Sequence, residues 1–308
     1  MRNSFIDTLC EIAEADERLF LLCGDLGYNV LEKFADKFPQ RFVNVGIAEQ
    51  NMMQVASGLA LDGYTVFTYS IGNFATLRCM EQIRYDICYH NLNVKVIAVG
   101  AGYAYGPLGA SHHTTEDLAM LRSIPNMVVA TPGDPLEVKA ITRALARHPG
   151  PGYIRLNKAG ERTVHTSLPN ICSIGASFSI NSGRHVAILA AGAMLIPAND
   201  YIQRQILPWS LLSFPFVSHL DKQALKSIVE THSFVITVEE HQLNGGFGSA
   251  VVEALSDMYA AGEIPRMPRV KRIGIPNQFL AICGTQEFLR EVAGITFEGA
   301  DKYVVVSP

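Results

Sequence analysis

The residue of this sequence with the clearest chemical potential is Glu49. A short apolar strand is expected to end at Val45, and Glu49 then stands in the first turn of an otherwise apolar helix. Most acidic residues at such a place only interact with the helix dipole. Here the neighbouring residues are apolar, which favours the protonated acid, and the carboxyl end of a strand is a common place for a ligand. Glu49 is therefore predicted to share a proton with a ligand nitrogen.

A second polar group lies in the loop 100–113, which follows the expected strand Val94–Val99. Its glycines resemble a dinucleotide-binding loop, but the third comes one position late and no helix follows at once, so nicotinamide binding is not expected. His112 and His113 could bind a metal, but adjacent side chains on a loop diverge and no third ligand has a suitable spacing. The loop is predicted to face a substrate, and no metal site is expected in this chain.

The glycine-rich segment 245–248 precedes an apolar helical stretch at 250–259. Amide groups at a helix N-terminus can bind an anion, and glycines allow a close approach. The same residues are equally compatible with a tight turn from a strand into a helix. The sequence leaves both interpretations open.

The elements that would position these residues alternate along the chain. Short apolar runs typical of buried parallel strands occur at Leu19–Cys23, 65–69, Val94–Val99, 127–130, 186–190, 234–238 and 304–306. Longer stretches with apolar residues at helical spacing lie between them, as at 50–61 and 77–89. This alternation is typical of βαβ units, so the predicted fold class is α/β, with two doubly wound, mostly parallel-sheet domains in tandem.

Length and pattern predict the division of the chain. Its 308 residues correspond to about two domains. Around 162–184 neither helical nor strand periodicity is clear, and a strand begins again at Val186. The expected division is a first domain at 1–165, a linker at 166–184 and a second domain at 185–308.

Composition excludes several classes of protein. The 25 Lys and Arg residues against 29 Asp and Glu, with no long basic run, argue against nucleic-acid binding. The most apolar run, 186–198, is too short to cross a membrane as a helix. The acidic first twenty residues fit neither a secretory signal nor a transit peptide, so a cytoplasmic location is expected. The 6 cysteines form no Cys-x-x-Cys pair and are expected to be buried free thiols.

Several segments together resemble one enzyme family. They are Gly-Asp-Leu-Gly at 24–27, Gly-Ile-Ala-Glu-Gln-Asn-Met at 46–52, Leu-Arg-Cys-Met-Glu-Gln-Ile-Arg at 77–84, Gly-Ala-Ser-His at 109–112 and Leu-Arg-Ser-Ile-Pro-Asn at 121–126. They resemble the transketolase group of thiamine-diphosphate enzymes. The resemblance covers nearly the whole chain and is to the carboxyl-terminal half of a transketolase. It implies a pyrimidine-binding domain at 1–165 and a transketolase C-terminal domain at 185–308, to which Val-Glu-Glu-His at 238–241 and Gly-Gly-Phe-Gly at 245–248 are similar.

This resemblance implies a thiamine diphosphate cofactor and assigns roles to five residues. In the family, the glutamate that matches Glu49 activates the cofactor through N1' of its aminopyrimidine. The family's stacking aromatic aligns with Phe74, flanked by Ile71 and Leu77, and an acidic position near the cofactor aligns with Asp25. The simpler alternatives are a core aromatic for Phe74 and turn chemistry for Asp25. The family's magnesium-diphosphate motif, Gly-Asp-Gly followed by paired Asn, is absent from the sequence, so the ligands of Mg2+ are expected on a partner.

On the substrate side the resemblance is weaker. His112, which is expected to be catalytic together with Glu49, aligns with a family histidine that contacts sugar hydroxyls. Lys158 aligns with a basic residue that binds a substrate phosphate, and Arg155, shortly before it, is also expected to bind the substrate. His113 is expected to add a polar group to the same loop. The family usually has an acidic residue where this chain has Leu108, and a substrate-binding histidine where it has Gly100. The sugar specificity is therefore expected to be altered.

The resulting prediction is the β-type subunit of a two-gene transketolase, which moves a two-carbon ketol unit between sugars. The implied partner is an α-type subunit carrying the diphosphate-binding domain, in an α2β2 heterotetramer with β–β contacts. One alternative is a thiamine-diphosphate subunit that uses pyruvate or another 2-oxo acid, which Leu108 favours to some extent. A second alternative is a non-catalytic module of the same fold, which the presence of Glu49 disfavours.

Overall fold

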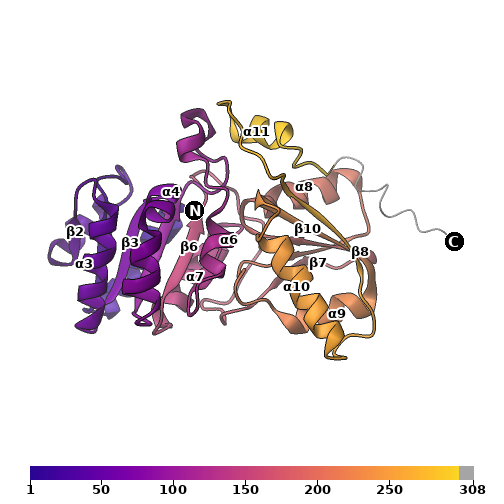
Figure 1. The fold of residues 1–308 in the computed structure, drawn as a ribbon, viewed down its shortest axis with the longest axis horizontal. Coiled ribbons are helices and arrows are strands. Elements are labelled where there is room, and N and C mark those ends of the chain that lie inside the picture. The colour runs from indigo at the N-terminus through magenta and orange to yellow at the C-terminus, as the bar shows by residue number, and fades with distance from the viewer. Residues whose placement is uncertain (298–308) are drawn as a thin grey trace.

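The computed structural model of the chain describes residues 1–297. It contains two α/β domains that lie side by side, each built on one sheet (Figure 1). The first domain begins at the N-terminus, and the second contains α11 near the end of the described chain (Figure 1). This arrangement confirms the predicted fold class.

The first domain has a six-stranded sheet with the order β2-β1-β3-β4-β6-β5. Its strands are β1 Leu19–Cys23, β2 Phe42–Asn44, β3 Thr65–Ile71, β4 Val94–Val99, β5 Val128–Ala130 and β6 Gly152–Leu156. All neighbours in this sheet are parallel. The carboxyl ends of the strands therefore meet at one edge of the sheet, where α/β proteins usually bind ligands.

Helices cover both faces of the first sheet. They are α1 Arg2–Ala15, α2 Glu32–Lys37, α3 Glu49–Leu61, α4 Gly72–Ala75, α5 Met80–Gln82, α6 Asp117–Arg122 and α7 Pro135–Arg147. Strand β3 illustrates the packing, because Val66 joins the core that contains Met52 of α3, whereas the next residue, Phe67, joins the core that contains Phe5 of α1. Burial of both faces explains the nearly continuous apolar runs of these strands.

The second domain has a five-stranded mixed sheet with the order β11-β10-β8-β9-β7. Its strands are β7 Phe178–Asn181, β8 His185–Ala190, β9 Ser210–Ser213, β10 His232–Gln242 and β11 Arg269–Ile275. Its helices are α8 Leu195–Gln205, α9 Lys222–Thr231, α10 Phe247–Ala260 and α11 Gln286–Val292. Strand β7 is antiparallel to β9, and the other neighbours are parallel.

Four strands of the structure, β6, β7, β9 and β11, were not among the predicted runs. Their sequences are interrupted by polar residues, such as Arg155 in β6 and Lys271 in β11, and β7 and β11 are edge strands with only partial burial. Strand β7 lies within 166–184, the predicted linker, so that stretch contributes a strand to the second sheet. The predicted run at 304–306 lies outside the described residues.

The periodicity of the stretch 77–89 predicts one regular helix, but the structure differs. The stretch consists of a 3-10 turn, Leu77–Cys79, the short α5 and a π-helical segment, Ile83–Cys88. The wider turn brings Ile83, Ile87 and Cys88 all into the core, where each is buried. An α-helix would turn one of the last two residues partly away from the sheet.

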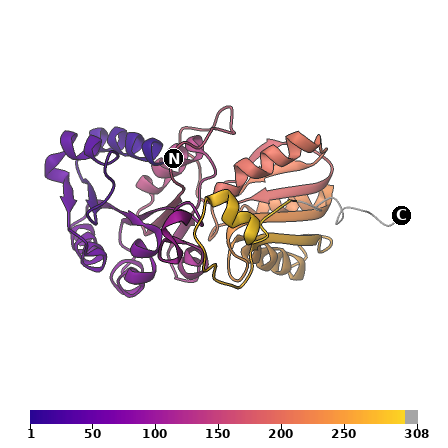
Figure 2. The same ribbon diagram turned by 90° about the horizontal axis from the view of Figure 1, so that it is seen from above.

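The two domains share one continuous core. The cluster on the α3 side of the first sheet includes Leu121 and Met127 of the first domain and Phe214 and Phe247 of the second. Seen from above, α11 lies close to the junction of the two domains (Figure 2). The C-terminal part of the described chain is thus packed near the first domain's loops.

Two sequence expectations concern the surface and the thiols. Among the described residues there is no helix long and apolar enough to span a membrane. The cysteines are free thiols, as predicted, but Cys283 is exposed whereas the other five are buried. Cys283 lies in the loop before α11.

Candidate active site

The predicted cofactor residues gather at the carboxyl edge of the first sheet. Asp25 follows β1, Glu49 begins α3 after β2, and Ile71 ends β3 with Phe74 in the short α4 that follows. Parallel pairing of β1, β2 and β3 brings these strand ends together. Side chains that are far apart in sequence therefore surround Glu49.

The carboxylate of Glu49 is buried, and the residue is 2% exposed. Its Oε2 accepts a hydrogen bond of 2.7 Å from Arg78 Nη1, and Ser70 Oγ lies 3.4 Å from Oε1. This corrects the prediction of an entirely apolar setting, because Arg78 places a positive charge beside the acid. The long contact with Ser70 leaves most of the accepting capacity of Oε1 unused.

The end of β1 approaches Glu49 closely at Gly24. A Cβ atom on Gly24 would come within 3.3 Å of Glu49 Cγ, a tighter contact than most side chains make. A larger residue at 24 would therefore require the Glu49 side chain to shift by a few tenths of an ångström.

A row of contacts leads from Glu49 to the predicted substrate residues. The guanidinium of Arg78 lies 4.8 Å from the centre of the Phe74 ring, and His112 meets the same ring edge-on at 5.2 Å. His112 is followed by Tyr105 at 6.4 Å, and the ammonium group of Lys158 lies 5.8 Å from the Tyr105 ring centre. The structure thus brings Glu49, Phe74, His112 and Lys158 into one row, and Arg78 and Tyr105 connect its members.

Burial lowers the pKa of His112, and the neighbouring His113 adds to this effect. Ser111 Oγ lies 2.9 Å from His112 Nδ1. The imidazole of His112 is therefore neutral near pH 7, and a neutral ring can both donate and accept a hydrogen bond.

Asp25 lies at the exposed end of β1 with a left-handed backbone, φ 56°. Asn44 Nδ2 donates to Asp25 Oδ1 at 3.0 Å, and the Asp25 amide donates to Asn44 Oδ1 at 3.0 Å. The pair ties the ends of β1 and β2 together. The turn chemistry considered for Asp25 is therefore present.

Ile71, the last residue of β3, is half-buried, and Leu77, in the 3-10 turn after α4, is exposed. Leu77 also lines a small cavity of about 100 Å3 whose wall includes Asn73 and Phe279. Apolar surface at this position is available to a ligand or partner.

The sequence predicts that His113 faces the substrate together with His112. In the structure, however, His113 points away from the row. It is buried against the ring of Tyr103 at 5.0 Å, and its Nε2 lies 3.5 Å from the carbonyl oxygen of Gly106. It lines the small cavity that also contains Leu77. The physical reason is that adjacent side chains on this loop point in different directions, so only His112 meets Phe74.

Arg155 is also placed differently from its predicted role at the substrate. It is buried, its Nε lies 2.9 Å from Asp117 Oδ2, and its Nη2 donates to the carbonyl oxygens of Thr114 and, at 3.1 Å, Glu240. Since these contacts join the two domains, we assign Arg155 to the domain interface. Arg155 stands between Ile154 and Leu156, and this apolar context in β6 is the sequence signal that could have indicated its burial.

Two departures from the family pattern have different structural settings. Leu108 is 57% exposed in a 3-10 turn, where its side chain is open to solvent. Gly100 has φ +96°, and a Cβ atom there would collide with the ring of Tyr105. The ring of Tyr105 therefore occupies the space that a side chain at position 100 would need.

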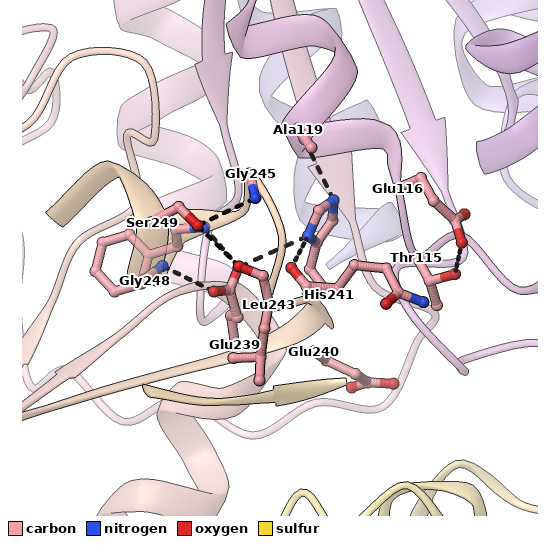
Figure 3. A network of polar contacts seen from close by, with 12 residues as sticks. Thr115, Glu116, Ala119, Glu239, Glu240, His241, Leu243, Gly245, Gly248 and Ser249 are labelled. Carbon is pink, nitrogen blue, oxygen red and sulfur yellow. Dashed lines mark hydrogen bonds and ion pairs between the residues drawn. The ribbon is translucent and has the colours of Figure 1, made fainter. Parts of the chain in front are cut away.

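A second polar network lies behind the site, at the end of β10 (Figure 3). The Glu239 carboxylate accepts hydrogen bonds from the amides of Phe247 at 2.5 Å and Gly248 at 2.7 Å, at the start of α10. The sequence allowed an external anion to bind at this helix N-terminus, but the carboxylate of Glu239 occupies it. The segment 245–248 is a tight turn from strand to helix.

Burial raises the pKa of Glu239 to about 7 and lowers that of His241 to about 4. His241 Nε2 accepts a hydrogen bond of 3.3 Å from the amide of Ala119, and its Nδ1 lies 2.8 Å from the carbonyl oxygen of Gln242 (Figure 3). These two partners require a neutral ring that carries its proton on Nδ1. His241 therefore joins β10 to α6 of the first domain.

Within residues 1–297 no three His, Cys, Asp or Glu side chains are grouped so that they could hold a metal ion. The residues around Glu49 fit the pyrimidine part of thiamine diphosphate. They offer a buried carboxylate with a free acceptor position, a half-buried aromatic ring and apolar neighbours.

Comparison with known proteins identifies the family of this chain. The family model described as transketolase, pyrimidine binding domain, matches residues 1–162, and the transketolase C-terminal domain model matches 178–298. A putative transketolase C-terminal section of Methanocaldococcus jannaschii is 33% identical over 99% of this chain and 95% of its own length. An apulose-4-phosphate transketolase subunit of Phocaeicola vulgatus is 33% identical over 90% of this chain and 88% of its own length.

Among solved structures, a split gene transketolase described as an inactive beta4 tetramer superposes with a TM-score of 0.84. It is 33% identical, and the match covers 98% of this chain and 96% of that one. The chain therefore belongs to the transketolase family and carries its pyrimidine-binding and C-terminal domains.

Proposed function

We propose that this chain is the β-type subunit of a two-gene transketolase and that it transfers a two-carbon ketol unit between sugars or sugar phosphates. The observation that carries the proposal is the row from the buried Glu49 through Phe74 and His112 to Lys158. An acid, an aromatic ring, a neutral imidazole and a cation follow one another along this row, and this order supports binding of a cofactor next to a phosphorylated substrate. The relatives named as transketolase sections or subunits support it.

The residues of this chain would hold the pyrimidine part of thiamine diphosphate. When bound, this cofactor supplies a nucleophilic carbon that breaks and forms carbon–carbon bonds next to a carbonyl group. Glu49 would hold a proton at the pyrimidine N1', with Arg78 fixing the direction of its carboxylate. Phe74, Ile71 and Leu77 would cover the ring, and Asp25 would lie at its rim.

On the substrate side, His112 would contact sugar hydroxyls and Lys158 would bind a phosphate. The neutral His112 can donate to one hydroxyl and accept from another. Lys158 is exposed at the end of β6, and its ammonium group is a point charge on a flexible stem, which suits phosphate.

The diphosphate and Mg2+ would be held by an α-type partner in an α2β2 assembly with β–β contacts. Large apolar residues lie open around the site, among them Tyr28, Leu77 and Ile47, which is 79% exposed. Such residues near a half-formed site support burial against another chain.

A second candidate, transfer from pyruvate or another 2-oxo acid, is favoured by one observation. Leu108 places an apolar, exposed side chain where the family usually has an acidic contact to a sugar hydroxyl. A 2-oxo acid has no such hydroxyl, so it would lose nothing at this position.

Reconstitution tests the proposal. The neighbouring gene product with a Gly-Asp-Gly motif should be purified and mixed with this chain, thiamine diphosphate and Mg2+. We expect ketol transfer from the mixture and none from either chain alone. A fully active mixture that uses only pyruvate would replace the proposal with the second candidate, and a mixture that binds cofactor but transfers nothing would favour a non-catalytic role.

A further inference from the structure

The loop that carries the substrate residues has little structure of its own. We call residues 100–113 the site loop. It contains two 3-10 turns, Gly106–Leu108 and Ala110–His112, and a β-bridge from Gly102 to Thr114. At its far end, Asn73 Nδ2 donates to the carbonyl oxygens of Ser111 at 3.2 Å and His113 at 2.8 Å. Substrate binding requires side chains held within a fraction of an ångström. Asn73 holds the His112 end of the loop, so its start and middle must be held by other residues.

Glu240 of the second domain contacts the loop from behind. It is 1% exposed, and its Oε1 accepts a hydrogen bond of 2.6 Å from the amide of Tyr103. Gly102 has φ +56°, and a Cβ atom there would lie 2.5 Å from the same carboxylate oxygen. The start of the site loop is thus shaped to admit this one side chain.

The same carboxylate binds α11. Arg290 donates to Glu240 Oε2 through Nε at 2.8 Å and also through Nη2, and Gln286 Nε2 lies 2.9 Å from that oxygen. Glu240 is therefore shared between the site loop and α11. Removal of Arg290 would leave the buried carboxylate of Glu240 without its opposite charge, which is energetically costly, so this contact is held strongly.

A second contact between α11 and the loop is made of backbone. The amide of Gly284, just before α11, donates to the carbonyl oxygen of Gly106 at 3.4 Å. A Cβ atom on Gly106 would lie 2.6 Å from Gly284 O and would collide with Leu289 of α11. The middle of the site loop thus rests directly on residues 284–289.

The neighbouring glutamate provides a contrast. Glu239 and Glu240 are adjacent in β10, so their side chains point to opposite faces, and Figure 3 shows the two carboxylates directed apart. Glu239 binds the start of α10 and lies 3.8 Å from His241 Nδ1, and these contacts are within its own domain. Two equally buried carboxylates therefore differ in whether they touch the site loop.

We infer that Glu240 and Arg290 are positioning residues for substrate binding. Through them, α11 of the second domain fixes the start and middle of the site loop and so the placement of Tyr105, whose ring lies 6.4 Å from that of His112. The inference rests on the proposed function for its kinetic test, but the conformation of the loop can be measured without it.

The test compares Glu240→Gln with its matched control Glu239→Gln in the reconstituted complex, using hydroxypyruvate as donor and ribose 5-phosphate as acceptor. Glu240→Gln should raise KM for ribose 5-phosphate about tenfold, with kcat and the Kd of thiamine diphosphate changed less than about threefold, as a small displacement of substrate groups predicts. Glu239→Gln should leave this KM unchanged. Arg290→Lys should be intermediate and Arg290→Met should resemble Glu240→Gln.

Amide hydrogen exchange on the full chain gives a readout that needs no activity. Exchange at 101–113 should become faster in Glu240→Gln and in Arg290→Met, but not in Glu239→Gln. Equal KM changes in the two glutamate variants, or unchanged exchange of the loop in both Glu240→Gln and Arg290→Met, would overturn the inference. If wild-type complex transfers no ketol unit, the proposed function fails, and hydrogen exchange alone then decides whether α11 holds the loop.

Discussion

At the scale of single residues, the candidate site depends on how Glu49 is held. Arg78 donates to its carboxylate and at the same time covers the Phe74 ring. The Glu49 side chain is 1% exposed and that of Arg78 45%, so the acid is fixed while the guanidinium remains partly hydrated. One arginine therefore sets the direction of the acid and one side of the aromatic ring.

We predict that Glu49→Gln in the reconstituted complex lowers kcat by about 10² or more, because glutamine cannot transfer a proton. Folding and cofactor binding should change little, since the partly hydrated Arg78 can turn to solvent. Hydrogen–deuterium exchange at the thiazolium C2 of the bound cofactor measures the step directly. The exposed Glu81→Gln serves as the control for loss of one negative charge, and an unchanged C2 exchange rate in Glu49→Gln would remove Glu49 from the activating role.

Leu108 carries the prediction on specificity. Because its apolar side chain would leave a sugar hydroxyl unpaired, wild-type complex should use xylulose 5-phosphate and fructose 6-phosphate weakly. Leu108→Asp should increase kcat/KM for these donors about tenfold, if one hydrogen bond of about 1.4 kcal/mol is restored. A panel that also includes hydroxypyruvate and pyruvate measures this.

The exposed position of Leu108 makes the substitution compatible with the fold, so the outcome is informative. Efficient use of xylulose 5-phosphate by the wild type would show that Leu108 does not mark altered specificity.

At the scale of elements, successive side chains of β10 point to opposite faces of its sheet and contact different parts of the molecule. Glu239 and His241 point to one face, where they bind the start of α10 and the Ala119 amide of α6. Glu240 points to the other face and binds the site loop and α11. Of these three consecutive residues, Glu240 and His241 therefore connect the two domains, and Glu240 also holds the site loop, whereas Glu239 binds within its own domain.

The opposite pKa shifts of Glu239 and His241 predict opposite pH effects on stability. The folded chain keeps a proton on Glu239 up to about pH 7, above the ordinary pKa of 4.5, so this group lowers stability as pH rises from about 4.5 to 7. The folded chain keeps His241 neutral down to about pH 4, below the ordinary pKa of 6.5, so this group lowers stability as pH falls from about 6.5 to 4. Between about pH 4.5 and 6.5 the two effects cancel.

Replacement of either Glu239 or His241 should reveal the effect of the other residue on the pH dependence of the free energy of unfolding. His241→Gln should make the free energy of unfolding fall with rising pH, relative to wild type, by about 1 kcal/mol per pH unit between pH 5 and 6. Glu239→Gln should change the slope by a similar amount in the opposite direction. Urea unfolding at pH 5, 5.5 and 6 measures both slopes, and two slopes equal to that of the wild type would contradict the assignment.

At the scale of the whole molecule, the proposed function makes this chain the carrier of half a site. The pyrimidine side would be built from the ends of β1, β2 and β3, and the second domain contacts the site loop from behind. Ile47 and Tyr28 are large apolar side chains that are exposed near these strand ends. They are where we propose that the partner chain completes the site.

We therefore predict that this chain alone does not bind thiamine diphosphate tightly, because most of the cofactor's charge lies in the diphosphate, which needs Mg2+ and its ligands. Titration calorimetry with and without Mg2+ should give only weak heats for the single chain and a Mg2+-dependent, saturable heat after the partner is added. Tight Mg2+-dependent binding to the chain alone would refute the half-site model.

The sequence by itself determined the fold class, most strands of the first sheet and the place of Glu49, because these depend on local periodicity and on where a strand ends. It also identified Phe74, His112 and Lys158 through a family resemblance, and the structure places them in one row with Glu49. Polar or partly buried strands such as β7 and β11 were missed, since their local pattern is weak.

Only the tertiary structure decided which polar groups face the site and which are internal. Arg78 pairs with Glu49 across 29 positions, and Arg155 contacts Glu240 across 85. Glu239 occupies the helix terminus that could have bound an external anion. The physical reason is that a charged side chain is satisfied by whatever partner the fold brings within about 3 Å, and no periodicity in the sequence encodes that partner.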